Sequence, residues 1–207
     1  MADTREKIMA TALRLFATDG YKAVSVSAIA GELGMTKGAL YKHFKSKRDI
    51  FDCIVRRMYQ IDEARARLYA MPEHPYEDSP QEYAQLSVRS MKDFTLGQFE
   101  FWAQDGFAAD FCRMLTLEQY RDPEMGRLYS GCMTAGPVAY MADIFAEMMK
   151  RGVLRQSDPK LLALEYYAPL YLLLNMAEGT RKREAALLLD AHVERFIKNN
   201  ILEKAEE

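Results

Sequence analysis

Apolar residues recur at helical spacing along most of the chain, and no stretch shows the strict alternation of a half-buried strand. A first helix is expected to end at Gly20, a residue type that suits the position after a helix. Residues 71–80 contain three prolines and predict a loop. Beyond it, the pattern predicts helices at about 81–104, 107–119, 123–151, 159–179 and 181–203. The chain is therefore expected to be all-α, with about nine helices.

Two prolines lie within these predicted helices. Pro137 follows Gly136, and Pro169 lies in the middle of the segment 159–179. Each removes a backbone hydrogen bond, so we expect a bend or a break at both positions.

The stretch 24–47 has the signals of two short helices joined by a tight turn. Ser25 and Thr36 are suitable caps for the two helices, and Gly34 supplies the positive φ that the exit from the first one needs. Leu40 and Phe44 point inward in the second helix, which leaves a basic and aromatic face outside. This arrangement is typical of a helix-turn-helix.

Ser46 is the expected cap of a fourth helix that runs to about residue 69. The sequence thus predicts two domains. Residues 1–46 form a three-helix DNA-binding head with the helix-turn-helix. Residues 47–207 form a larger helical ligand-binding and dimerisation domain, and the fourth helix joins it to the head.

Charge is distributed unevenly along the 207 residues, although the formal net charge is only −2. Residues 1–58 carry 11 Lys and Arg against 6 Asp and Glu, whereas the remainder carries 17 against 24. A basic end on an acidic body indicates a polyanionic partner at that end. Three widely separated cysteines suggest reduced thiols. With no signal peptide and no apolar run long enough to span a bilayer, we expect a cytoplasmic protein without membrane contact.

Catalytic and metal-binding patterns are absent from the sequence. His43, His74 and His192 are isolated, and no zinc-ligand spacing, Gly-rich phosphate loop or nucleophile elbow occurs. We therefore predict that the protein is not an enzyme and has no cofactor and no metal.

The N-terminal sequence resembles the tetracycline-repressor (TetR) family of regulators over residues 4–57. The match includes ALRLFATDGY at the end of the first helix, SVSAIA at 25–30 and ELGMTKGALYKHFKSKRDIF at 32–51. Val24 and Gly31 depart mildly from the family pattern. The resemblance implies a homodimer that binds a double-stranded DNA operator and responds to a small-molecule effector.

Ten residues are predicted to contact DNA. Gly38 and Ala39 have almost no side chain, which allows close approach to the bases, and the hydroxyls and lysines suit phosphates. The resemblance adds Tyr41, Lys42 and His43. The alternative is that the lysines are merely solvated, the hydroxyls only cap helices, and His43 is a buried histidine. The full set is Ser25, Ser27, Thr36, Lys37, Gly38, Ala39, Tyr41, Lys42, His43 and Lys47.

Two further sets come from the remainder of the chain. An aromatic and methionine-rich region predicts a pocket for a small ligand, although such stripes also form ordinary core. Its residues are Phe99, Trp102, Phe107, Phe111, Met114, Tyr129, Met133 and Tyr140. Apolar stripes on the last two helices predict a dimer interface, or else packing within the subunit. These residues are Leu161, Leu164, Ala168, Leu172, Leu188, Leu189, His192 and Phe196.

The sequence is compatible with two functions. The first is a homodimeric repressor that a small apolar or aromatic molecule releases from its operator. The alternative is a helical small-molecule-binding protein or enzyme whose head makes only protein contacts. DNA binding that weakens steeply with salt would favour the first.

Overall fold

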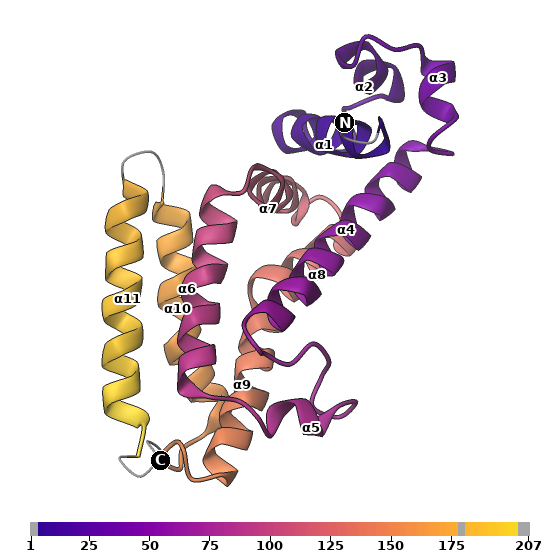
Figure 1. Cartoon of the computed structure of the whole chain (residues 1–207). Coiled ribbons are helices and arrows are strands. Elements are labelled where there is room, and N and C mark those ends of the chain that lie inside the picture. Colours follow the sequence, from indigo (N-terminus) through magenta and orange to yellow (C-terminus); the bar gives the residue numbers. More distant parts are fainter. Residues whose placement is uncertain (1–3, 178–180, 203–207) are drawn as a thin grey trace. The chain divides into compact units, whose positions relative to one another are not determined.

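The computed structural model describes residues 4–177 and 181–202 (Figure 1). The described residues form eleven helices and no strand, apart from an isolated bridge between Leu154 and Ile201. The helices are α1 (Thr4–Asp19), α2 (Val26–Glu32), α3 (Lys37–Tyr41), α4 (Lys47–Leu68), α5 (Pro80–Tyr83), α6 (Val88–Gln104), α7 (Gly106–Glu118), α8 (Pro123–Met133), α9 (Ala135–Lys150), α10 (Pro159–Met176) and α11 (Arg181–Asn200). The all-α prediction is confirmed.

The chain divides into two compact units. The first combines residues 1–62 with residues 104–129, and the second combines residues 63–103 with residues 130–207. Helix α4 contributes to both, since the division falls within it. Helix α7 and most of α8 thus belong with the N-terminal helices, so the division does not coincide with the predicted boundary after residue 46.

The first unit is built around the inward faces of α1 to α4. Phe16, Ile29, Leu40 and Phe44 are almost completely buried. Helix α7 packs along α1 and buries its own apolar stripe, which consists of Ala108, Phe111, Met114 and Leu115. Burial of side chains of this size is the main stabilising contribution to such a unit.

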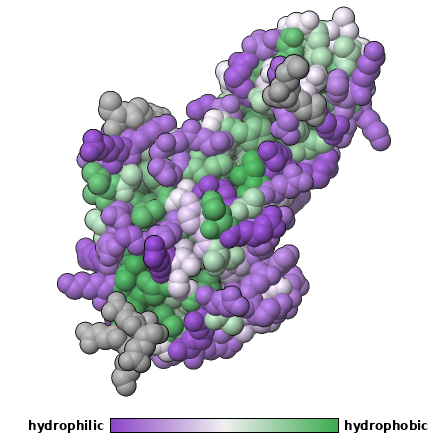
Figure 2. Space-filling model, viewed as in Figure 1, coloured by the Kyte–Doolittle hydropathy of each residue, from purple (hydrophilic) through white to green (hydrophobic). Residues whose placement is uncertain are grey.

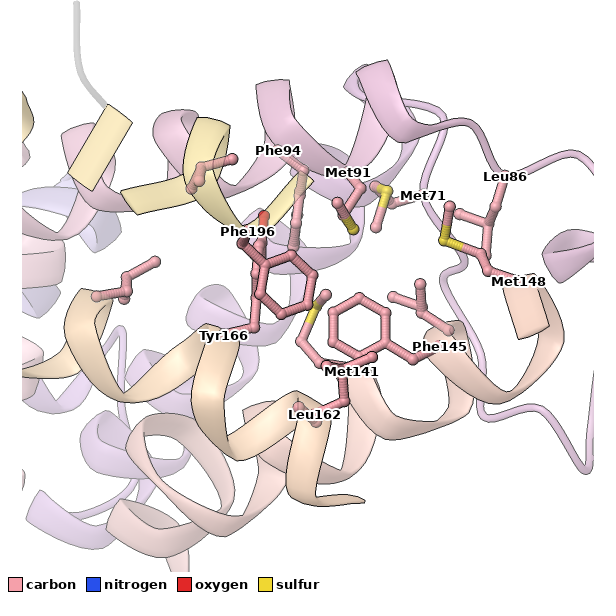
Figure 3. Packing of buried hydrophobic residues seen from close by; sticks show 14 of the residues in the cluster. Met71, Leu86, Met91, Phe94, Met141, Phe145, Met148, Leu162, Tyr166 and Phe196 are labelled. Carbon is pink, nitrogen blue, oxygen red and sulfur yellow. The ribbon is translucent and has the colours of Figure 1, made fainter. Parts of the chain in front are cut away.

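The second unit has its core between α6, α9, α10 and α11 (Figure 3). Phe145 and Phe196 stack with their ring centroids 5.4 Å apart, and Tyr166 meets Phe196 edge-on at 4.6 Å. The Tyr166 hydroxyl forms a buried hydrogen bond of 2.8 Å with Thr95 Oγ1. Burial raises the pKa of Tyr166 and keeps this hydroxyl neutral.

The predicted helix 123–151 is in fact two helices, which meet at Thr134. The break lies just before Pro137, as the sequence suggested, because Pro137 is tolerated in the first turn of α9, where backbone N–H groups have no helical partner. Gly136 is required there, since an added Cβ would lie 1.8 Å from the carbonyl oxygen of Gly131.

Other boundaries differ more modestly. The predicted helix 81–104 is replaced by the short α5 and by α6, whose start is capped by the Ser87 hydroxyl. Helix α10 contains Pro169 without ending there, because an 18-residue helix packed on α9 and α11 tolerates one missing hydrogen bond. The predicted ends at residues 179 and 203 lie outside the described residues.

Polar side chains cover much of the face seen in Figure 2, with smaller apolar patches between them. In the part of the chain that the structure describes, no helix combines the length and the apolar character needed to cross a membrane.

Candidate functional site

The helix-turn-helix forms as its capping signals predict. The Ser25 hydroxyl accepts a hydrogen bond of 3.0 Å from the Ala28 amide at the start of α2. Gly34 has φ +64°, and the Met35 amide then returns to the carbonyl of Ala30 at 3.0 Å. The Thr36 hydroxyl accepts from the Ala39 amide at 3.1 Å and starts α3. These caps hold the two short helices without help from a ligand.

The outer face of α3 is polar, basic and free of large obstructions. Lys37, Gly38, Tyr41 and Lys42 are exposed, whereas Leu40 is fully buried beneath them. An added Cβ at Gly38 would meet only the Thr36 hydroxyl, at 3.9 Å. Packing within the protein therefore does not explain the glycine, whereas close approach of a partner does.

The lysines of this face are not neutralised by carboxylates. Among the described residues, none of the ion pairs involves Lys37 or Lys42. The Lys37 ammonium instead lies 5.8 Å from the centre of the Tyr41 ring. Ser25, Ser27 and Thr36 are also exposed on these helices. Positive charge and hydroxyl donors are thus available to a polyanion.

Two predicted DNA contacts are turned partly into the protein. His43 is half-buried, and its carbonyl oxygen accepts a hydrogen bond of 2.7 Å from Arg5. The Lys47 ammonium donates to the carbonyl oxygens of Tyr21 at 2.8 Å and Val24 at 2.9 Å. Burial lowers the pKa of this ammonium, and Glu118 opposes the shift. Lys47 therefore fastens the α1–α2 connection here, and its contact with a phosphate stays a prediction.

The same connection is held from its other side by α7. Glu118 is buried, and its carboxylate accepts a hydrogen bond of 3.0 Å from the Tyr21 amide. Gly20 has φ +87°, and an added Cβ there would lie 2.7 Å from a Glu118 carboxylate oxygen. The connection is thus bound at its amide by α7 and at its carbonyls by α4. Sequence analysis missed this role of Glu118.

The eight predicted ligand-binding residues are divided between the two units. Phe99, Trp102, Met133 and Tyr140 belong to the second unit, and the other four belong to the first. Phe111 and Met114 are completely buried where α7 packs against α1. These two side chains form core with α1, which favours the alternative of ordinary core for them. A pocket that contains the others stays a prediction.

A half-buried arginine in the second unit was not among the predicted residues. Arg65 lies on α4, and its Nε donates to the side-chain oxygen of Gln98 on α6 at 2.9 Å. Its guanidinium lies 4.5 Å from the centre of the Phe101 ring. The available signal was a basic residue on the inward stripe of α4, four positions before Tyr69.

The predicted dimer residues fall into three groups by exposure. Five are exposed, namely Leu161, Leu164, Ala168, Leu172 and Leu188. Leu189 and Phe196 are buried in the core of the subunit, so their assignment to the dimer surface is wrong. Helix α11 turns both side chains into the core shared with α9 and α10, although Leu189 directly follows the exposed Leu188. His192 is half-buried, and its ring nitrogen lies 3.1 Å from the Tyr166 carbonyl oxygen.

Residues 8–54 match the model of the tetR family of bacterial regulatory proteins. Over 47 residues the chain is 49% identical to YerO of Bacillus subtilis, an uncharacterized HTH-type transcriptional regulator, covering 23% of this chain and 16% of YerO. Over 49 residues it is 47% identical to the HTH-type transcriptional regulator AcrR of Shigella flexneri, covering 24% and 23% of the two chains. The matched region therefore spans less than a quarter of each of these regulators.

The fold likeness extends over the whole chain. SmeT, the repressor of the Stenotrophomonas maltophilia multidrug efflux pump SmeDEF, aligns with a TM-score of 0.65 at 19% identity, over 100% of this chain and 94% of that one. A SmeT–triclosan complex aligns with a TM-score of 0.71 at 17% identity, over 99% and 94%. Residues 8–54 thus carry a helix-turn-helix region of the TetR type, and the chain as a whole shares the fold of these solved structures.

Proposed function

We propose that the protein is a homodimeric transcriptional repressor that leaves its operator when a small apolar or aromatic molecule binds. The observation that carries this proposal is the outer face of α3. There, exposed lysines that pair with no carboxylate of the described residues flank a glycine that packing does not require. A short helix with such a face fits the major groove, and phosphates on both walls attract its charges.

Dimerisation is supported by the exposed apolar side chains of α10 and α11. Leu161, Leu172 and Leu188 are 65%, 59% and 50% exposed, although each belongs to a helix whose opposite face is buried. The two helices pack against each other. Two such faces related by a two-fold axis would form a four-helix interface. The two heads would then address half-sites roughly 34–36 Å apart.

Release by ligand is supported by the continuity of α4. This helix begins with the Lys47 contact to the α1–α2 connection, and its last residues belong to the second unit. A ligand that favours one arrangement of the dimer needs a coupling of only about 1–3 kcal/mol to change its affinity for DNA appreciably. The SmeT–triclosan complex shows that a protein of this fold binds a small aromatic molecule.

The test is a gel shift on the DNA upstream of the protein's own gene, repeated at several salt concentrations. Tyr41→Ala and Lys42→Met should weaken binding, and Lys42→Met should lower the salt dependence by about one counterion. Arg89→Met is the matched control, because Arg89 is 92% exposed on α6, outside the helix-turn-helix. If both variants bind like the wild type, the proposed docking of α3 is wrong.

A further inference from the structure

Arg65 on α4 is a half-buried cation with one buried, unsatisfied donor atom. Its Nη2 atom is buried and has no hydrogen-bond partner among the described residues. None of the ion pairs found in that part of the chain includes Arg65. Only the Nε atom is engaged, with Gln98. Buried charged donors nearly always find an acceptor in folded proteins, so an unpaired one calls for a partner of opposite charge.

The surroundings of Arg65 are aromatic. The Phe101 ring lies 4.5 Å and the Tyr69 ring 5.7 Å from the guanidinium carbon. Trp102 meets Phe101 edge-on at 5.5 Å. Tyr69 in turn meets Phe94 at 6.0 Å. The cation therefore lies in a row with aromatic rings from α6 on one side and from Tyr69, the residue directly after α4, on the other.

Glycine at position 97 of α6 is part of this arrangement. An added Cβ there would lie 2.2 Å from the Tyr69 hydroxyl oxygen, so only glycine lets this ring rest against the α6 backbone beside Arg65. The row continues to α9, because Phe94 and Tyr140 are 6.1 Å apart and the Tyr140 hydroxyl donates to the Pro72 carbonyl at 2.9 Å.

A purely structural role explains Arg65 poorly. The helix dipole stabilises a cation in the last turns of α4. Arg67 already provides such a cation at the surface, where it pairs with Glu73 at 2.6 Å. Stacking on aromatic rings accounts for the flat faces of the guanidinium. It leaves the in-plane N–H groups of Nη2 without an acceptor.

We propose that Arg65 is the anion-binding group of the effector site and that the effector is an aromatic molecule bearing an oxyanion such as a carboxylate or a sulfonate. Arg65 Nη2 donates to the oxyanion, the Gln98 side chain fixes the guanidinium plane, and the rings of Tyr69, Phe101 and Trp102 contact the apolar body. That the bound anion acts as an effector rests on the proposed function, whereas its binding at Arg65 does not.

Two fluorescent probes with one ring system test the proposal directly. 1-Anilinonaphthalene-8-sulfonate carries the anion, and N-phenyl-1-naphthylamine lacks it. The wild type should bind the sulfonate at least ~10-fold more tightly, the scale of one charge-assisted hydrogen bond. Arg65→Met should abolish that preference and leave the affinity for the neutral probe within about threefold. Arg67→Met, with its exposed cation on the same helix, should keep the preference.

A second arm needs no variant and guards against misfolding of Arg65→Met. Naphthalene-2-carboxylate should displace N-phenyl-1-naphthylamine from the wild type at lower concentration than naphthalene-2-carboxamide does. Equal displacement by the two compounds overturns the proposal. So does a sulfonate preference that persists in a folded Arg65→Met variant, or that Arg67→Met removes equally.

The DNA gel shift is run on the same preparations without probe, which separates the two proposals. DNA binding without any anion preference overturns the assignment of Arg65 alone. An Arg65-dependent anion preference in a protein that does not bind DNA supports the assignment and overturns the regulator function.

Discussion

Replacing Lys47 with methionine should loosen the α1–α2 connection. The wild-type ammonium donates to the carbonyl oxygens of Tyr21 and Val24, with a longer contact of 3.3 Å to that of Lys22. It also lies 4.5 Å from the centre of the Tyr21 ring. Methionine keeps most of the apolar length of the side chain but offers these carbonyls no donor. The connection leads directly to Ser25, the cap of α2.

The size of the effect follows from these contacts. A hydrogen bond from a charged donor contributes about 1.5–3 kcal/mol, and a cation–π contact near the surface about 0.5–1 kcal/mol. Lys47 is only half-buried, so water replaces part of what the ammonium supplied. The net loss should be about 2 kcal/mol in the free energy of unfolding, or about 4–8 °C in Tm for a chain of this length.

The assay combines thermal unfolding, followed by circular dichroism, with DNA binding at several salt concentrations. Lys45→Met is the control, because Lys45 is exposed and only its backbone amide is bonded, to Asp49 at 2.8 Å. If the Lys47 ammonium holds the carbonyls of the α1–α2 connection, Lys47→Met should lower the Tm and Lys45→Met should not. An unchanged Tm of Lys47→Met, together with a salt dependence of DNA binding reduced by about one counterion, would refute this role and favour a direct phosphate contact.

Three further outcomes follow from other contacts. Gly136→Ala should lose about 1–3 kcal/mol or more in chemical denaturation, because its Cβ would overlap a backbone oxygen, whereas Gly131→Ala, with open space, should be neutral or better. The hydrogen bond to the Glu82 carboxylate raises the pKa of His74 above its ordinary 6.5, and the same contact lowers the pKa of Glu82 to about 2. Their interaction should therefore stabilise the loop below pH 6.5, fade as the pH rises through the raised pKa of His74, and weaken again as the pH falls toward 2. An NMR titration of Glu82→Gln should find the pKa of His74 lowered toward its ordinary value. Leu172→Asp should yield monomers in sedimentation, and an intact dimer would exclude Leu172 from the interface.

The sequence predicts the N-terminal helices well because their signals are local. A hydroxyl cap or a glycine with positive φ acts within three or four residues of itself, so Ser25, Gly34 and Thr36 can be interpreted without knowledge of the rest of the chain. The split at Thr134 is similar, because Gly136 and Pro137 mark it from within the segment.

The sequence contains no comparable local signal for which helices pack against each other. Leu188 and Leu189 differ by one position, or about 100° around α11, yet one is half-exposed and the other completely buried. Helical periodicity indicates that a stripe will be covered but not which element covers it. The same holds for polar groups such as Arg65. From the sequence alone, a charged residue near a helix end is expected to be solvated, and only the structure shows that Gln98 and Phe101 lie beside it.

Helix α7 offers a second route by which the helix-turn-helix can be displaced. Its apolar stripe resembles that of a pocket-lining helix, yet Phe111 and Met114 are buried where α7 packs along α1. Glu118 at its end binds the Tyr21 amide directly. Any displacement of α7 must therefore break this hydrogen bond and leave a buried carboxylate with one fewer donor, or move the α1–α2 connection with it. The second course shifts Ser25 and the start of α2, so α4 is not the only element through which the helix-turn-helix can be displaced.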